Sequence, residues 1–200
     1  SLSNIKSKKC NLSKSFLLTN KALITEKIGG SLFCLMIHWD NRSEINEISE
    51  TTSFMEKVYD EGIKVGLSGI KYPKLYYDSC PRLRSKWFIQ VKENIIEKTG
   101  REKYLEFFPN AKYQAYGINL GGIKLEENDK SISARLRNIQ FNKEIKVKIK
   151  GLKKEFQDLP LERSVYEFLF SSIYQKKSIS EIIIAPSNLN QLASIIKFKN

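Results

Sequence analysis

Short apolar runs of strand length alternate with segments whose apolar residues have helical spacing, and this alternation restricts the fold more than any other feature. The first run, residues 31–38, is nearly continuous, which is typical of a strand buried on both faces. Parallel strands need long right-handed connections, so the alternation predicts βαβ units and one parallel sheet. The five predicted strands are residues 31–38, 63–68, 86–91, 112–116 and 181–185.

Helical patterns occupy most of the connections between these runs. In residues 43–61 the apolar side chains recur at mostly helical intervals, with Ser43 and Asn46 as candidate capping residues and Gly62 as the expected stop. The other predicted helical segments are residues 72–79 (a short helix or turn), 101–108, 161–175 and 190–198.

Residues 122–150 interrupt this order, and we expect a basic loop or hairpin inserted in a single domain that spans residues 1–200. Residues 144–150 alternate strictly between charged and apolar side chains, which places Lys146, Lys148 and Lys150 on one face of a strand. One interpretation is an edge strand whose lysines discourage edge pairing. The other is a basic flap that closes over an anionic ligand.

Composition narrows the class of protein. With 41% hydrophobic and 28% charged residues in a chain of 200, the sequence is typical of a globular protein. No run approaches the roughly 18 apolar residues that a membrane span requires, and no signal peptide is visible. Cys10, Cys34 and Cys80 lack metal-ligand spacing, which predicts reduced thiols in the cytoplasm and no metal site.

The charge balance favours an anionic partner. Lysine and arginine total 34 against 22 acidic residues, a net charge of +12. A polyanion or a phosphate-bearing cofactor fits this excess. Because no DNA- or RNA-binding motif is present, nucleic acid is the less favoured partner.

Candidate functional residues are expected at the carboxyl ends of the predicted strands, because parallel α/β folds place their active sites there. The first strand ends in Ile37, His38, Trp39 and Asp40, and His38 is the only histidine in the chain. A lone histidine is usually a structural residue, so the neighbouring strand ends decide its interpretation.

Five strand ends, taken in order, resemble motifs of the aldo-keto reductase family. The matching segments are IHWD (37–40), EGIKVGLSG (61–69), WFIQVK (87–92), AYGINLG (115–121) and IIAPSNLNQL (183–192). They are similar, in the same order, to the family's IHWP, GKIRxIGxSN, xxQxE, AYSPLG and IPGxSNxxxL. The resemblance extends over about residues 31–195.

The resemblance implies a (β/α)₈ TIM-type barrel that binds NAD(P)H without a Rossmann domain and reduces an aldehyde or ketone. Such a barrel typically needs about 250 residues. We therefore expect an incomplete barrel that begins near the end of the third strand. The chain is then either a fragment of a longer protein or a degenerate family member.

The resemblance also suggests catalytic residues. His38 matches the family's histidine, which orients the carbonyl, and Lys8 matches the lysine that lowers the pKa of a proton-donor tyrosine. Trp39 is a candidate substrate contact. The proton-donor tyrosine and its aspartate partner have no counterpart in the matching segments, so we expect this chain alone to be inactive.

The cofactor side has more matches. The candidate cofactor-binding residues are Ser68, Gln90, Tyr116, Gly121, Ser187 and Asn188. By resemblance, the first two bind the nicotinamide carboxamide, the tyrosine stacks on its ring, and the others lie near the phosphates. Gly69 replaces the family's asparagine and Lys92 its acid, so cofactor binding should be weak or altered. NADPH is expected rather than NADH.

Three functions stay open at this point. The first is a cytoplasmic NAD(P)H-dependent aldo-keto reductase acting on a small carbonyl compound. The second is a non-catalytic relative that retains the sheet and binds a partner. The third is a basic nucleic-acid-binding domain. In any of these, the exposed strand edges of an incomplete barrel favour self-association or a loss of rigidity.

Overall fold

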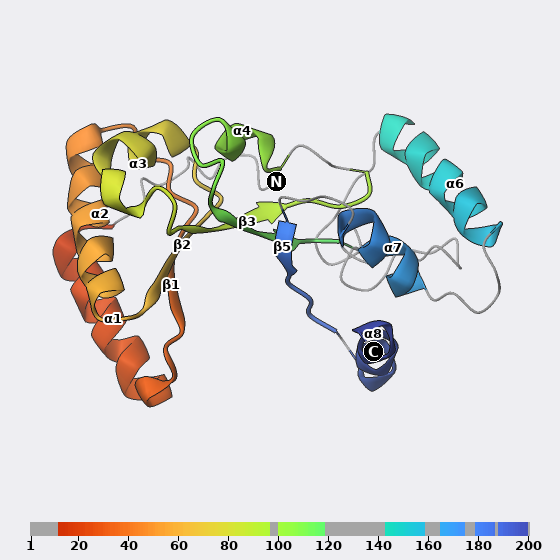
Figure 1. The fold of residues 1–200 in the computed structure, drawn as a ribbon, viewed down its shortest axis with the longest axis horizontal. Helices are drawn as coiled ribbons and strands as arrows, with labels where there is room; N and C mark the ends of the chain where they lie inside the picture. The colour runs from red at the N-terminus through yellow and green to blue at the C-terminus, as the bar shows by residue number, and fades with distance from the viewer. Residues whose placement is uncertain are drawn as a thin grey trace, which may run out of the picture. The chain divides into compact units, whose positions relative to one another are not determined.

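Five strands form one sheet in the computed structural model, which describes residues 12–96, 100–118, 143–158, 165–174, 179–186 and 188–199 (Figure 1). The strands are β1 (Cys34–His38), β2 (Lys64–Ser68), β3 (Phe88–Lys92), β4 (Lys112–Tyr116) and β5 (Ile179–Ile182). Their order in the sheet is the order of the chain. Parallel strands alternate with helices, so the predicted fold class, an incomplete (β/α)₈-type barrel, is confirmed.

Strand pairing is parallel along the sheet. β1 pairs with β2, and β2 with β3, in parallel register. The Lys112 N–H donates to the Trp87 carbonyl at 3.2 Å, and the Glu93 N–H donates to the Tyr116 carbonyl, also at 3.2 Å. Because both strands advance in the same direction between these two bonds, β3 and β4 are also parallel. β5 continues the sheet beside β4.

The strand limits differ from the predicted ones mainly at two ends. β4 has the predicted limits, whereas β1 begins at Cys34 because Gly29–Ser31 form a 3₁₀ turn, η2. β5 ends at Ile182, three residues earlier than predicted. Pro186 follows soon afterwards and has no N–H to offer a strand ladder.

Most helices lie within the predicted segments. They are α2 (Ile45–Asp60), α3 (Pro73–Ser79), α4 (Glu102–Leu105), α7 (Val165–Tyr174) and α8 (Leu189–Lys199). Gly62 follows α2 with φ +83°, as expected for a helix stop. The N-cap of α2 is Glu44 and no side chain caps it, so the predicted capping by Ser43 is wrong.

α1 (Lys14–Ile28) was not predicted from the sequence. Leu17 is its only buried residue, while Phe16, Leu18 and Leu23 are 41%, 50% and 48% exposed. The apolar residues of α1 thus point in several directions and give no single stripe at helical spacing.

The segment predicted as a basic edge strand or hairpin is instead part of a helix, α6 (Lys143–Gln157). After Ile149 the next apolar residues are Leu152 and Phe156, at intervals of three and four, which is helical spacing. Glu144 and Lys148, one turn apart, form an ion pair at 2.6 Å. The strand interpretation was wrong because it rested on residues 144–150 alone. The helical spacing of the apolar residues is visible only when residues 151–156 are included. Residues 122–142 lie outside the described residues.

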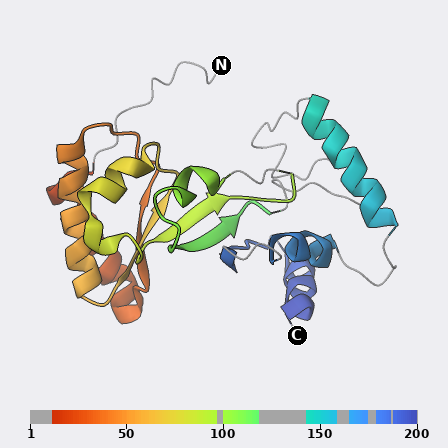
Figure 2. The same ribbon diagram turned by 45° about the horizontal axis from the view of Figure 1, so that its top comes forward.

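The chain divides into two compact units. One comprises Ser1–Gln90 with Glu102–Tyr113, and the other comprises Val91–Arg101 with Gln114–Asn200. In the first unit α2 packs against β2 and α3 (Figure 2). The fully buried side chains of this unit include those of Ile48, Met55 and Trp87. The prediction of a single domain stays a prediction. No helix in the described ranges is long and apolar enough to cross a membrane.

Candidate functional site

Three predicted site residues form one row across the sheet. His38 ends β1 and is in register with Ser68, which ends β2, and Ser68 is in register with Gln90 of β3. Neighbours in a parallel register are about 4.8 Å apart in the hydrogen-bonding direction and face the same side. Three neighbouring strands therefore present an imidazole, a hydroxyl and a carboxamide side by side. The first two lie at the carboxyl ends of β1 and β2, and the carboxamide comes from the middle of β3.

The row lies on the less covered face of the sheet. The alternating positions Ile37, Leu67 and Ile89 are 2%, 0% and 0% exposed, which identifies the other face as the core side. His38 is exposed and Gln90 is intermediate. The row is thus accessible at His38 and partly at Gln90, whereas Ser68 between them is 3% exposed.

Trp39 is held in an unusual backbone conformation next to His38. Its φ is +58°, its ring stacks on that of His38 at 4.9 Å between centroids, and it is 69% exposed. A Cβ added at Gly69 would lie 3.0 Å from Nε1 of Trp39 and closer still to Cδ1. The Trp39 indole therefore occupies the space that a side chain at position 69 would need, which is a steric reason for glycine there.

Backbone hydrogen bonds fasten the chain after β1 to the chain after β2. The Trp39 N–H donates to the Ser68 carbonyl at 2.9 Å, and the Lys71 N–H donates to the Asp40 carbonyl at 2.8 Å. Together with the stacking of the two rings, these bonds fix the position of Trp39 relative to His38 and Ser68.

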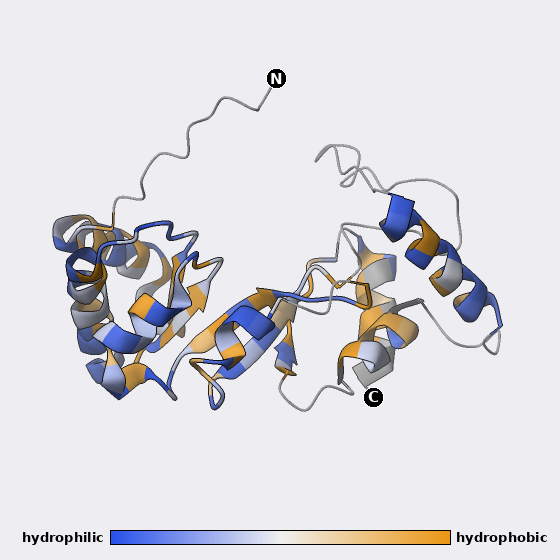
Figure 3. Cartoon of the chain, turned by 90° about the horizontal axis from the view of Figure 1, so that it is seen from above, coloured by the Kyte–Doolittle hydropathy of each residue, from blue (hydrophilic) through white to orange (hydrophobic). Residues whose placement is uncertain are grey.

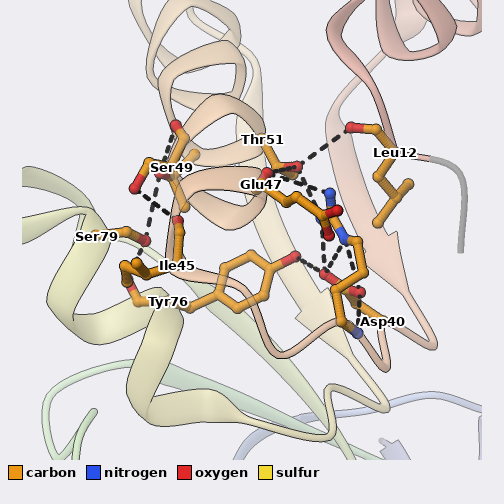
Figure 4. A network of polar contacts seen from close by, with 10 residues as sticks. Leu12, Asp40, Ile45, Glu47, Ser49, Thr51, Tyr76 and Ser79 are labelled. Atoms are coloured by element: carbon orange, nitrogen blue, oxygen red, sulfur yellow. Dashed lines mark hydrogen bonds and ion pairs between the residues drawn. The ribbon is translucent and has the colours of Figure 1, made fainter. Parts of the chain in front are cut away.

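A buried ion pair lies within the loop that follows β1 (Figure 4). Arg42 donates from Nη2 to Asp40 Oδ2 at 2.8 Å and from Nε to Asp40 Oδ1 at 3.0 Å. The Tyr76 hydroxyl donates to Asp40 Oδ2 at 2.6 Å, and Arg42 also reaches the Thr51 hydroxyl at 2.8 Å and the Glu47 carbonyl at 3.2 Å. Asp40 and Arg42 are only 1% and 5% exposed.

The surroundings of Asp40 and Tyr76 keep each of them in one protonation state at neutral pH. Burial opposes ionisation of Asp40, but the hydrogen bonds from Arg42 and Tyr76 outweigh it and lower the pKa of Asp40 below its ordinary value. Burial, together with the adjacent Asp40 charge, raises the pKa of Tyr76 well above its ordinary value. Asp40 is therefore ionised and Tyr76 neutral at pH 7, which suits a structural support rather than a proton-transfer pair.

This support was not predicted from the sequence. Asp40 was noted only at the end of the first predicted strand, and the only local signal was the spacing of Asp40 and Arg42. Tyr76 joins from α3, 36 residues later than Asp40. Nothing in the linear pattern connects these two positions.

The other predicted residues are only partly described. Tyr116 is the last residue of β4, is of intermediate exposure, and belongs to the second unit. Asn188 is exposed, and its carbonyl accepts the Leu192 N–H at 3.2 Å at the start of α8. Lys8, Gly121 and Ser187 lie outside the described residues. The convergence of these positions on the His38 row stays a prediction.

The described part of the chain shows no cluster of three histidine, cysteine or acidic side chains that could hold a metal ion. Cys80 is buried, and its thiol donates to Glu56 Oε1 at 3.3 Å. Burial raises the pKa of Cys80 to about 12, so this thiol is protonated and unreactive at neutral pH.

Comparison with known proteins gives a match in structure. No protein-family model matches the sequence, and no curated protein matches it. A similar fold occurs in the crystal structure of the thermostable aldo-keto reductase Tm1743 in complex with the inhibitor epalrestat, with a TM-score of 0.58 and 18% sequence identity. The shared feature is the fold. The match covers 94% of this chain and 62% of that reductase, so this chain spans less than two thirds of the reductase's length.

Proposed function

We propose that this chain forms the nicotinamide-binding part of a cytoplasmic aldo-keto reductase-like enzyme that reduces an aldehyde or ketone with NADPH. The observation that carries the proposal is the register row of His38, Ser68 and Gln90 across three parallel strands, in which His38 and Ser68 are the last residues of β1 and β2. The similar fold of an aldo-keto reductase supports it.

The chemistry of the row suits a nicotinamide carboxamide. That group has a carbonyl acceptor and an NH₂ donor, while a serine hydroxyl and a glutamine amide can each donate and accept. Ser68 is 3% exposed and lies in register between His38 and Gln90. Ser68 and Gln90 are therefore the residues that would hold the carboxamide through hydrogen bonds.

His38 and Trp39 would act on the substrate side. When bound, NADPH supplies the hydride, and the protein supplies positioning and electrostatic stabilisation. The exposed imidazole of His38 can donate an N–H to a carbonyl oxygen and stabilise the negative charge that develops there. The neighbouring indole of Trp39, 69% exposed, offers an apolar wall against which a carbonyl compound can lie.

Protonation of the reduced oxygen needs a general acid. None of the nine tyrosines lies in a segment that matches the family's proton donor. Losing a general acid typically lowers the rate by about 10²- to 10⁴-fold. We therefore expect NADPH binding with very slow turnover from these 200 residues alone.

Two measurements on the same protein test the proposal. NADPH is titrated while its fluorescence is followed, and 4-nitrobenzaldehyde is then added while nicotinamide absorbance is followed. Saturable binding with slow turnover is the expected result. Absence of NADPH binding would overturn the proposal and favour a non-catalytic binding module. Rapid turnover that is lost in His38→Ala would refute the argument from the missing proton donor.

A further inference from the structure

Four lysines of α6 share one face of the helix. Lys143, Lys146, Lys150 and Lys154 follow at intervals of three, four and four residues, which confines them to an arc of about 80°. All four are exposed. We call them the lysine face. In the described part of the chain none of them has a carboxylate partner, whereas Lys148 is paired with Glu144.

The other sides of α6 have different chemistry. Ile149, Leu152 and Phe156 are half-buried on the apolar side, where the Phe156 ring lies 5.9 Å from that of Phe168 in α7. Glu144 and Glu155 fall on a third side. Figure 3 shows this helix as mainly hydrophilic with a narrower apolar band. Positive charge is thus segregated on the side away from the packing contact.

We propose that the lysine face binds the phosphodiester backbone of a nucleic acid without reading its sequence. Eleven residues of helix separate its first and last lysines, about 16.5 Å at 1.5 Å per residue. One strand of a duplex presents about five phosphates over that length, at 3.4 Å each. The lysine face is therefore comparable in length to a short run of phosphates, and the net charge of +12 favours the encounter.

The absence of a nucleic-acid-binding motif does not oppose this proposal. Contacts to phosphates fix position and supply affinity, but they carry no sequence information and need no motif. The expectation from the sequence disfavoured nucleic acid on that ground, when residues 144–150 were interpreted as a strand. As a strand, residues 144–150 would place three lysines on one face, whereas the helix places the four lysines of the lysine face on one side.

An anionic membrane is the alternative polyanion, and the structure favours nucleic acid over it. A helix that lies in a membrane interface buries an apolar face in the lipid. The apolar side of α6 packs on α7 through Phe156, and Val147, 71% exposed, is the one exposed large apolar side chain among those described in this helix. The accessible side of α6 therefore offers mainly charged groups and only one apolar side chain, too little apolar surface for insertion into lipid.

Fluorescence anisotropy with the full 200-residue chain tests the proposal. The probes are a labelled 20-nucleotide oligothymidylate and a labelled 20-base-pair duplex, titrated between 50 and 200 mM KCl. If all four lysines contact phosphates, log Kobs against log salt should have a slope of about −2.8 for the single strand and about −3.6 for the duplex.

Two quadruple variants with equal charge separate the lysine face from net charge. The test variant is K143Q/K146Q/K150Q/K154Q. The control variant, at exposed lysines elsewhere in the described chain, is K14Q/K27Q/K57Q/K86Q. Each lowers the net charge from +12 to +8 (12 − 4 = 8). The test variant should lose at least about tenfold in affinity at 100 mM KCl and most of the salt slope, while the control should stay within about threefold. Far-UV circular dichroism confirms that α6 persists, since glutamine and lysine have similar helix propensity.

Three results would overturn the proposal. One is no binding of either probe at 50 mM KCl. Another is an equal loss in both variants, which would assign binding to net charge. The third is tighter, lysine-face-dependent binding to vesicles containing 30% phosphatidylserine than to either oligonucleotide, which would assign the face to membranes.

Discussion

The carboxylate of Asp40 and the guanidinium of Arg42 are joined at 2.8 Å with side chains that are 1% and 4% exposed. The pair sits directly after the strand that carries His38, and Tyr76 closes it from α3. It is therefore the most direct link between the stability of the first unit and the geometry of the proposed site.

Asp40→Ala should lower the free energy of unfolding by about 3–5 kcal/mol, because it leaves the Arg42 charge buried without its partner. Urea unfolding followed by circular dichroism measures this change. Asp78→Ala is the matched control, because Asp78 pairs with Lys74 at 2.5 Å on the exposed surface of α3. That loss should stay within about 0.5 kcal/mol. Equal losses would show that the buried pair has no special role.

Stability should fall at both ends of the pH range. The pKa of Asp40 is lower in the folded than in the unfolded state, so its contribution is present above the unfolded value of about 3.9 and is lost as pH falls through the folded value. The pKa of Tyr76 is raised, so its contribution is complete below about pH 10 and is lost as pH rises further. Thermal unfolding from pH 2 to 11 measures both limbs. In Tyr76→Phe the alkaline limb should be shallower, and an unchanged limb would contradict the assignment.

Gly69→Ala should be more destabilising than Gly62→Ala. Both glycines have positive φ, +66° and +83°, so alanine strains the backbone at each by roughly 1–2 kcal/mol. Only at Gly69 would the added methyl group also meet the Trp39 indole, since nothing lies within 4 Å of a Cβ at Gly62. Near-UV circular dichroism should report a displaced indole in Gly69→Ala alone. Equal stability losses in the two variants would mean that moving the Trp39 indole costs no free energy, and would contradict the prediction.

Ser68→Ala and Gln90→Ala should weaken NADPH binding while leaving the binding of 2′,5′-ADP unchanged. Each removes one hydrogen bond to the carboxamide, worth about 0.5–1.5 kcal/mol, or roughly a 2- to 12-fold loss of affinity. Because 2′,5′-ADP lacks the nicotinamide, it reports only the other half of the site. Isothermal titration measures both ligands, with Ser85→Ala, an exposed serine outside the row, as the control. A parallel loss for the two ligands would contradict the assignment of the row to the carboxamide.

The sheet was predictable because its strands are short apolar runs with clear limits. β4 matched residue by residue, since its pattern is confined between a turn and a glycine. α1 was missed because its apolar residues do not form one stripe, so its packing against α2 is not encoded in its own spacing. In α6, residues 144–150 fit both the two-residue period of a strand and the 3.6-residue period of a helix. Only the next helical turn shows that the helical period is the correct one.

The site was predictable to the level of positions along strands. His38 and Ser68 could be assigned to strand ends, and parallel pairing then brings them into register. Contacts made across loops could not be inferred in the same way. The fit of Trp39 against Gly69 depends on two backbone conformations at once, and the Asp40 support depends on a side chain from α3.

Because strand order follows chain order, each strand finds its partner in the one synthesised just before it. On the ribosome, β1, α2 and β2 can assemble as soon as residue 68 has left the exit tunnel, and β3 then adds to an existing edge. Such a sheet grows by one strand and helix at a time. A chain that ends after β3 contains both strands of each earlier pair, so this part of the sheet can form before the rest is synthesised.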